Sequence, residues 1–232
     1  MLSSDAPGKL YGISVGPGDP ELLTLKAVRT IKLCPVLAVP RTHGERTLAL
    51  DIAEQAVDIS NKDILYLDFL MSDDARATKE NHARHAERIA AVLEKGRNVG
   101  MLSLGDASLY STFPYIAERI IKLGYETETV PGVTSFCACA AVLNRSLTEM
   151  CLPLTILPAS YECLEEALGL PGGKVVMKPA RTLARIKALA AKKGLAEKAA
   201  AVTDCGLPSQ SVHESICDMP EDGYFTTILI RP

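Results

Sequence analysis

The fold is decided by residues 14–27, which read Ser14-Val15-Gly16-Pro17-Gly18-Asp19-Pro20-Glu21-Leu22-Leu23-Thr24-Leu25-Lys26-Ala27. A β-like run over residues 9–15 enters this stretch, and an amphipathic helix is predicted over residues 21–32. The turn between them contains two glycines and two prolines. Strand, glycine-containing turn and helix in this order are typical of a small-ligand site at the carboxyl edge of a parallel sheet, because glycine lets the backbone approach a ligand without an intervening Cβ.

This turn matches neither of two common phosphate-binding motifs. The dinucleotide fingerprint G-x-G-x-x-G needs glycine where Glu21 stands, and the P-loop needs lysine where Asp19 follows Gly18. A carboxylate also has the wrong charge for a phosphate cradle. We therefore predict a ligand that is not held by phosphates. The alternative is a structural turn in which Asp19 caps the helix and Pro20 takes its first position.

Length and composition set the broad class. The chain has 232 residues, of which 47% are apolar, enough for one large or two small domains. The net charge is −3 and no basic block occurs, which argues against nucleic acid as a partner. Without an apolar run of about 18 residues or a signal-peptide pattern, we expect a cytoplasmic protein with no membrane partner. The 7 cysteines include no C-x-x-C pair, so free thiols and no metal site are predicted.

Predicted strands and helices alternate through the first half of the chain. The strands cover residues 9–15, 36–40, 63–69, 98–104 and 126–130, and the helices cover residues 21–32, 47–56, 75–95, 113–123 and 136–143. This alternation favours an α/β layer with a mostly parallel sheet.

The second half has a different pattern, with several short strands and few helices. Strands are predicted at residues 154–158, 174–177, 200–203, 213–216 and 224–230, and helices at residues 163–167 and 182–193. Such a pattern indicates a separate α+β domain. We expect an N-terminal α/β domain over residues 1–125. A C-terminal domain of the α+β type is expected over residues 126–232.

Three turns share one property: each follows a predicted strand and precedes a helix. They are residues 16–19, 105–108 and 131–135, and each contains glycine. Because the carboxyl ends of parallel strands meet at one edge of a sheet, these turns should gather there. Together they predict a walled site for a flat, polar small molecule.

The three turns also resemble the signatures of the tetrapyrrole methylase family, in the same order and at similar spacing. The resembling stretches are residues 13–27, residues 104–110 (Leu-Gly-Asp-Ala-Ser-Leu-Tyr) and residues 130–136 (Val-Pro-Gly-Val-Thr-Ser-Phe). The resemblance covers essentially the whole chain, and three motifs in register are far more specific than one. Residues 33–41, 108–113 and 223–228 further resemble the members that methylate C20 of precorrin-2 or cobalt-factor II on the route to cobalamin.

The resemblance implies a two-domain α/β protein, usually a homodimer, that binds S-adenosyl-L-methionine in a cleft between its domains and releases S-adenosyl-L-homocysteine. The positions it implies as cofactor contacts are Pro17, Leu104, Gly105, Asp106, Leu109, Thr134, Ser135, Lys178 and Cys205. Two positions depart from the family pattern. Ala107 replaces the usual proline, and Leu104 stands where relatives often have glycine. These departures predict a less rigid second turn and a less close backbone approach to the cofactor.

Methyl transfer from a sulfonium requires neither a metal nor a protein nucleophile, and the sequence has no obvious Ser-His-Asp or Cys-His set. The enzyme must instead align the reacting atoms and exclude water. Asp106 is the first catalytic candidate, as a carboxylate that stabilises the cation formed on the macrocycle, with a turn-capping aspartate as the alternative. Tyr224 and Lys178 are candidates for accepting a proton or binding substrate, against a strand-packing tyrosine and a surface lysine.

The expected substrate is a reduced tetrapyrrole that carries several carboxylates, with or without bound cobalt. Two readings within the family stay open, namely methylation at another ring position and methylation of another acceptor such as the diphthamide precursor. A non-catalytic nucleotide-binding regulator is the alternative from a different class. Binding of S-adenosylhomocysteine but not of mononucleotides would separate the methyltransferase from that regulator.

Overall fold

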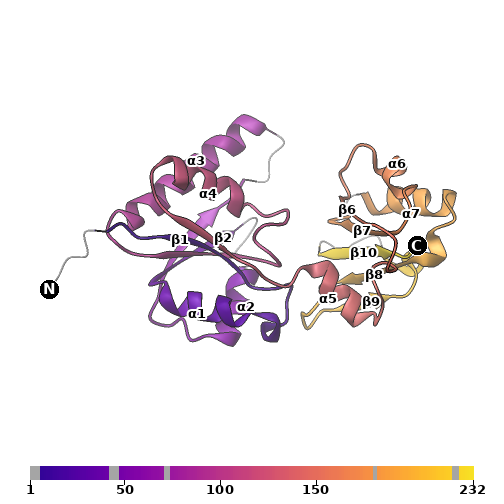
Figure 1. The fold of residues 1–232 in the computed structure, drawn as a ribbon, viewed down its shortest axis with the longest axis horizontal. Coiled ribbons are helices and arrows are strands. Elements are labelled where there is room, and N and C mark those ends of the chain that lie inside the picture. Colours follow the sequence, from indigo (N-terminus) through magenta and orange to yellow (C-terminus); the bar gives the residue numbers. More distant parts are fainter. Residues whose placement is uncertain (1–5, 42–46, 71–73, 180–181, 221–224) are drawn as a thin grey trace. The chain divides into compact units, whose positions relative to one another are not determined.

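The structure is a computed structural model that describes residues 6–41, 47–70, 74–179, 182–220 and 225–232. The chain divides into two compact units, Met1–Thr134 and Ser135–Pro232 (Figure 1). Each unit contains a five-stranded sheet with helices packed on both faces. This arrangement confirms the predicted α/β class with two sheets.

The sheet of the first unit is parallel throughout, with strand order β3-β2-β4-β1-β5. Its strands are β1 (Leu10–Ser14), β2 (Val36–Arg41), β3 (Asp63–Asp68), β4 (Val99–Ser103) and β5 (Thr127–Val130). Figure 1 shows α1 (Leu25–Leu33) and α2 (Leu48–Ala56) on one face, and α3 (Ala75–Leu93) and α4 (Phe113–Lys122) on the other. Strands covered on both faces are apolar at successive positions, which is why β2 and β4 have continuous apolar sequences.

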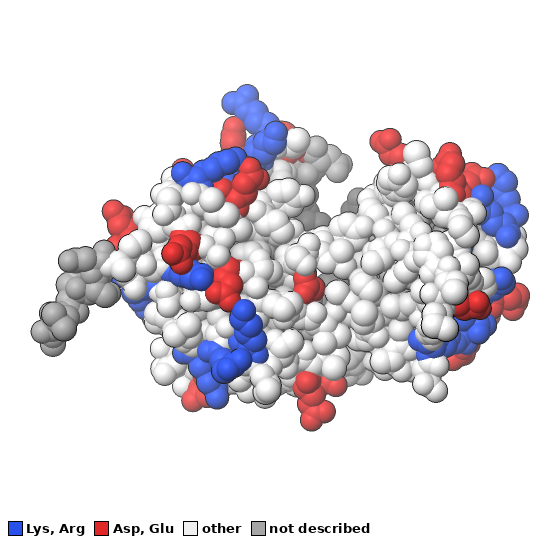
Figure 2. All heavy atoms as spheres, in the orientation of Figure 1, with Lys and Arg blue, Asp and Glu red and all other residues white. Residues whose placement is uncertain are grey.

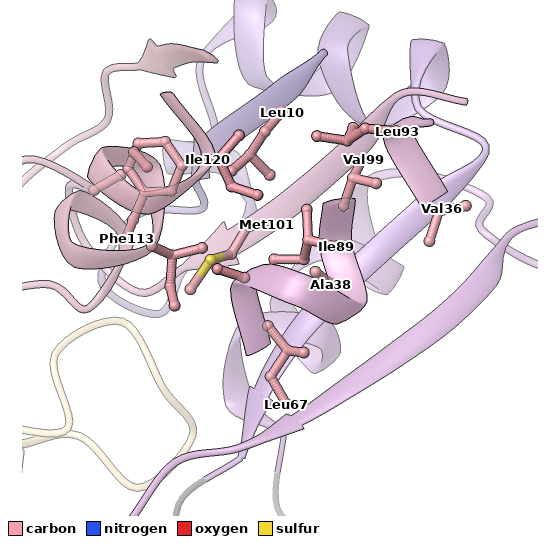
Figure 3. Close-up of a cluster of buried hydrophobic side chains, with 14 of the residues drawn as sticks. Leu10, Val36, Ala38, Leu67, Ile89, Leu93, Val99, Met101, Phe113 and Ile120 are labelled. Atoms are coloured by element: carbon pink, nitrogen blue, oxygen red, sulfur yellow. The ribbon is translucent and has the colours of Figure 1, made fainter. Parts of the chain in front are cut away.

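Successive residues of β2 illustrate this two-sided burial. Val36 and Ala38 pack with the residues of α3 and α4, whereas Leu37 and Val39 pack with those of α1 and α2. Figure 3 shows the first of these two cores, in which Ile120 of α4 lies near Leu10 of β1. The two cores hold the sheet rigidly, so the turns that leave its carboxyl edge start from well-positioned strand ends.

The strand β5 belongs to the first unit. It pairs with β1 from Leu10 opposite Thr127 to Ile13 opposite Val130. The two units therefore divide between Thr134 and Ser135, later in the chain than the expected boundary between residues 125 and 126. The alternating sequence pattern groups this strand with those of the first half, but its pairing partner is a long-range property, so local sequence could not place the boundary after it.

The second unit has a mixed sheet with strand order β6-β7-β10-β8-β9. Its strands are β6 (Leu154–Pro158), β7 (Gly173–Met177), β8 (Ala199–Thr203), β9 (Ser211–His213) and β10 (Thr226–Ile230). The helices α6 (Leu164–Leu168) and α7 (Leu183–Lys192) pack against one face of this sheet. The helix α5 (Ser135–Val142) lies against β10 and β8, and its Ser135 reaches Thr227, whose neighbour Ile228 packs with α6 and α7.

Two predicted elements were wrong in detail. The helix predicted over residues 21–32 begins only at Leu25, where the Thr24 hydroxyl accepts from the Ala27 amide, and Asp19 caps a separate 3-10 turn at Pro20–Leu22. The strand predicted at residues 213–216 is displaced to Ser211–His213, and Ile216–Asp218 forms a 3-10 turn. In both places a Ser, Thr or Asp side chain bonds to a nearby backbone amide and ends the regular pattern.

Buried polar side chains tie α3 to the end of β3. Asn81 and His85 are each 5% exposed, and both donate to the carbonyl oxygen of Asp68, at 3.0 and 2.9 Å. Nδ1 of His85 is buried and has no hydrogen-bond partner among the described residues. Burial lowers the pKa of His85, because the charged imidazolium loses its hydration, and this outweighs the hydrogen bond to Asp68.

We expect acid to destabilise the protein through His85. The unfolded chain takes up this proton near pH 6.5, whereas the folded protein resists it to lower pH. The unfolded state then binds more protons, so the free energy of unfolding should fall as the pH drops below about 6.5. Arg84 and Arg88 reinforce the effect and Asp68 opposes it. Urea unfolding at several pH values should give a shallower pH slope for His85→Gln than for the wild type, and equal slopes would contradict the assignment.

Candidate functional site

The first two glycine turns are joined through their backbones. Gly16 and Gly105 exchange a pair of hydrogen bonds, with N–H···O distances of 3.2 and 2.7 Å. Both residues have positive φ, +75° and +71°, a conformation that glycine adopts without strain. The two turns therefore form one continuous backbone surface at the carboxyl edge of the sheet, as predicted.

Ser14, the last residue of β1, links the second turn to the end of β5, directly before the third turn begins. Its hydroxyl donates to the carbonyl oxygen of Val130 at 2.6 Å and accepts from the amide of Ala107 at 2.9 Å. The side chain is fully buried. The sequence reasoning missed this residue, and the available signal was a polar side chain at the end of an otherwise apolar, buried strand.

The Asp106 carboxylate makes a second link to the third turn. It accepts from the amide of Gly132 at 2.7 Å and from the amide of Ser108 at 2.8 Å, and the residue is 9% exposed. Burial on its own would raise the pKa of Asp106, but the hydrogen bonds from Ser108 and Gly132 prevail and hold that pKa below its usual value. Asp106 is therefore an ionised carboxylate engaged in holding the turns.

The third turn fits closely against the other two. A Cβ on Gly132 would lie 2.4 Å from Cβ of Ser14 and 2.8 Å from the carbonyl oxygen of Gly105. Both neighbours belong to buried parts of the chain that cannot move aside. Only glycine fits here, and the backbone of the third turn is held at a fixed position.

Thr134 carries an unsatisfied polar atom at the end of the third turn. Its Oγ1 is buried and has no hydrogen-bond partner among the described residues. A buried hydroxyl without a partner is rare in folded proteins and costs free energy unless a ligand or water supplies the bond. Since Thr134 is one of the predicted cofactor contacts, this hydroxyl fits a ligand with a hydrogen-bonding group at that place.

The remaining predicted contacts of the first unit lie within the first two turns or directly beside them. Pro17 and Gly105 are buried, and Leu104 and Leu109 are partly exposed on either side of Asp106. The structure thus brings together the predicted residues of the first unit. It also shows that Asp19, which we expected at a helix cap, caps the 3-10 turn that follows Gly18.

The predicted residues of the second unit lie at one edge of its sheet. Lys178 follows β7 and Cys205 follows β8, and the register places Met177 opposite Thr227 and Thr203 opposite Thr226. Ser135 Oγ lies 3.3 Å from Oγ1 of Thr227 at the same edge. Tyr224 lies outside the described residues.

Two backbone positions at this edge are unusual. Lys178 has φ +58° and Asp204 has φ +52°, in the left-handed region that side chains other than glycine rarely adopt. Such conformations are concentrated at functional sites, where the surrounding structure offsets their cost. Burial also lowers the pKa of Lys178. Cys205 is buried, and a hydrogen bond with the Cys139 thiol lowers the pKa of Cys205.

Three further observations concern metals, surface charge and membrane-spanning helices. Among the described residues, no group of three or more His, Cys, Asp or Glu side chains is placed to hold a metal ion. On the face shown in Figure 2, Lys and Arg side chains are interspersed with Asp and Glu. In the part of the chain that the structure describes, no helix is both long and apolar enough to span a membrane.

The comparisons with known proteins give one family. The sequence profile of the Tetrapyrrole (Corrin/Porphyrin) Methylases matches residues 9–217. Cobalt-precorrin-2 C(20)-methyltransferase of Salmonella typhimurium is 34% identical over 230 residues, covering 97% of this chain and 96% of that protein. Precorrin-2 C(20)-methyltransferase of a Sinorhizobium species is 28% identical, covering 99% of this chain and 97% of that protein.

Solved structures share the fold at low sequence identity. A cobalt precorrin-4 methyltransferase superimposes with a TM-score of 0.76 at 18% identity, covering 96% of this chain and 94% of that one. Uroporphyrin-III C-methyltransferase from Thermus thermophilus, solved in complex with S-adenosylhomocysteine, gives a TM-score of 0.70 at 22% identity, covering 96% and 97%. With the profile spanning most of the chain, the protein belongs to the tetrapyrrole methylase family.

Proposed function

We propose that the protein is an S-adenosylmethionine-dependent C-methyltransferase that methylates C20 of precorrin-2 or cobalt-factor II in cobalamin biosynthesis. The observation that carries this proposal is the 34% identity to a cobalt-precorrin-2 C(20)-methyltransferase over 97% of the chain. A second relative, of Sinorhizobium, is named for the same ring position on precorrin-2 and matches almost the whole chain.

The geometry of the three turns supports S-adenosylmethionine as the cofactor. The turns offer a tight backbone surface and an unsatisfied hydroxyl at Thr134, but no phosphate-binding motif. This cofactor has no phosphates, and its amine, carboxylate and adenine suit such a surface. A family member with the same fold was solved with S-adenosylhomocysteine, the product of the cofactor.

We infer that the first unit holds the cofactor through Pro17, Leu104, Gly105, Asp106, Leu109 and Thr134. From the second unit we propose Ser135, Lys178 and Cys205. Bound S-adenosylmethionine supplies an activated methyl group. The residues of this chain have to orient that group toward the macrocycle and exclude water. This reaction does not require a nucleophile from the protein. We propose that Lys178, whose pKa is lowered, and Tyr224 either accept a proton or bind a carboxylate of the substrate. We further propose that the protein acts as a homodimer in the cytoplasm.

Isotope transfer tests the reaction. The protein is incubated with S-adenosylmethionine carrying a ¹³C-labelled methyl group and with either precorrin-2 or cobalt-factor II, and the product is analysed by NMR. We expect one labelled methyl at C20. Label at another carbon would overturn the ring position, and absence of label from both macrocycles would overturn the enzyme assignment. Heat-denatured protein serves as the control, and the ratio of the two turnover rates shows whether the natural substrate carries cobalt.

A further inference from the structure

We propose that Ser14 and Asp106 are positioning residues, which hold the third turn in register with the first two so that the cofactor surface is preassembled. This inference rests on the proposed function, because it assigns a role within the cofactor site. Ser14 lies in the first of the stretches that resemble the family but was not among the candidate site residues. Asp106 is assigned here a positioning role beside its proposed cofactor contact, in place of the catalytic role expected from the sequence.

The connections between the turns differ in kind. The first and second turns are joined by the backbone pair of Gly16 and Gly105, which needs no side chain. The ladder between β1 and β5 ends at Ile13 and Val130, before the third turn begins. Beyond that point, the hydrogen bonds that reach the third turn from other described segments of the first unit come from side chains.

Ser14 secures the end of β5, from which the third turn starts. One hydroxyl contacts the carbonyl oxygen of Val130 and the amide of Ala107, so it joins residues from β5 and from the second turn. The side chain is fully buried, and water cannot replace either bond when the hydroxyl is removed. Alanine at this position would leave a buried amide and a buried carbonyl without their partner.

Asp106 secures the next residues of the third turn. Each of its two oxygens accepts a hydrogen bond from a backbone amide: Oδ2 from the Gly132 amide, and Oδ1 from the Ser108 amide. A carboxylate with both oxygens occupied by backbone amides, and with its ionised form stabilised by them, is well suited to hold a loop. The hydroxyl of Thr24 adds one long contact to Pro131, at 3.4 Å, which is a weaker link.

The two links also affect the position of Thr134, which lies two residues beyond Gly132 in the third turn. If the third turn shifts, the unsatisfied hydroxyl of Thr134 moves with it. Binding of the cofactor should then weaken, whereas the chemical step, once the cofactor is bound, should change less. If the Asp106 carboxylate were catalytic, its removal should instead slow the chemical step and leave binding of the cofactor largely unchanged.

Amide hydrogen exchange tests the links without any cofactor. In the wild type, the amides of Ala107 and Gly132 should be protected. Ser14→Ala should expose the Ala107 amide, and Asp106→Ala should expose the Gly132 amide. Thr30→Val is the matched control, because Thr30 is also a buried hydroxyl but bonds only within α1, to the carbonyl oxygen of Lys26. Unchanged exchange at both amides in the variants would overturn the inference whatever the enzyme does.

Calorimetry and kinetics test the functional part. Ser14→Ala and Asp106→Ala should weaken binding of S-adenosylhomocysteine about ten- to hundredfold, as expected for loss of a buried or charge-assisted hydrogen bond. Asp106→Asn keeps an oxygen for the Gly132 amide and should lose less. The KM for S-adenosylmethionine should rise more than kcat falls, and Thr30→Val should bind like the wild type.

Two results would overturn the positioning role. One is wild-type affinity in both alanine variants. The other is an equal, large fall of kcat in Asp106→Asn and Asp106→Ala with unchanged KM, which would make Asp106 catalytic. If the wild type itself failed to bind S-adenosylhomocysteine, the proposed function would fall, and the exchange measurement would still decide whether the two links exist.

Discussion

Alanine in place of Ile120 should lower the free energy of unfolding of the first unit by about 2–5 kcal/mol. Ile120 is fully buried in α4 and belongs to the core between α3, α4 and the sheet (Figure 3). Removing three carbons leaves a cavity that the packed surroundings can fill only in part. Urea unfolding followed by far-ultraviolet circular dichroism measures the change.

The next residue along the helix provides the control. Ile121 has the same side chain, but it is 57% exposed. Ile121→Ala should change the free energy of unfolding by no more than about 0.5 kcal/mol, as surface substitutions commonly do. Equal losses in the two variants would show that burial at position 120 is not what stabilises α4.

Alanine in place of Gly132 should impair the cofactor site most severely. The new Cβ would lie 2.4 Å from Cβ of Ser14 and 2.8 Å from the carbonyl oxygen of Gly105, so the third turn has to move away from the second. The hydrogen bond from the Gly132 amide to Asp106 would then be lengthened or lost. We expect a loss of about 1–3 kcal/mol in stability from overpacking and about a hundredfold lower kcat/KM, since a displacement near 1 Å can cost that much.

Gly169→Ala is the corresponding control in the second unit. A Cβ there would approach the carbonyl oxygen of Glu166 at 3.2 Å and Nζ of Lys193 at 3.4 Å, and the lysine is flexible. Binding of S-adenosylhomocysteine, measured by calorimetry, should stay at the wild-type level in Gly169→Ala and fall in Gly132→Ala. Wild-type binding in Gly132→Ala would contradict the close fit of the three turns.

Much of the site could be predicted from local pattern. Strands followed by glycine turns and helices indicate parallel strands, and parallel strands bring their carboxyl ends to one edge. The strand pattern therefore predicts that the turns at residues 16–19, 105–108 and 131–135 lie side by side. The structure confirms the arrangement through the Gly16–Gly105 pair and the Asp106–Gly132 hydrogen bond.

Other features depend on residues far apart in the chain. Ser14 is 116 residues from Val130 and 93 from Ala107 in the sequence. The residues around Ser14 therefore do not indicate which groups it binds. From the sequence, Asp106 was equally suited to catalysis and to capping, and only its contacts in the folded chain show which backbone amides bind to it. Likewise, only the fold shows that β5 pairs with β1 at the edge of the first sheet.

The sequence by itself determined the order of the elements, the parallel sheet of the first unit and the residues of the three turns, because propensity, periodicity and glycine content act locally. The tertiary structure decided which side chains join those turns, where the two units divide, and that the hydroxyl of Thr134 is left without a partner among the described residues. The physical reason is that hydrogen bonds between distant segments depend on strand register and packing, and these are properties of the folded chain as a whole.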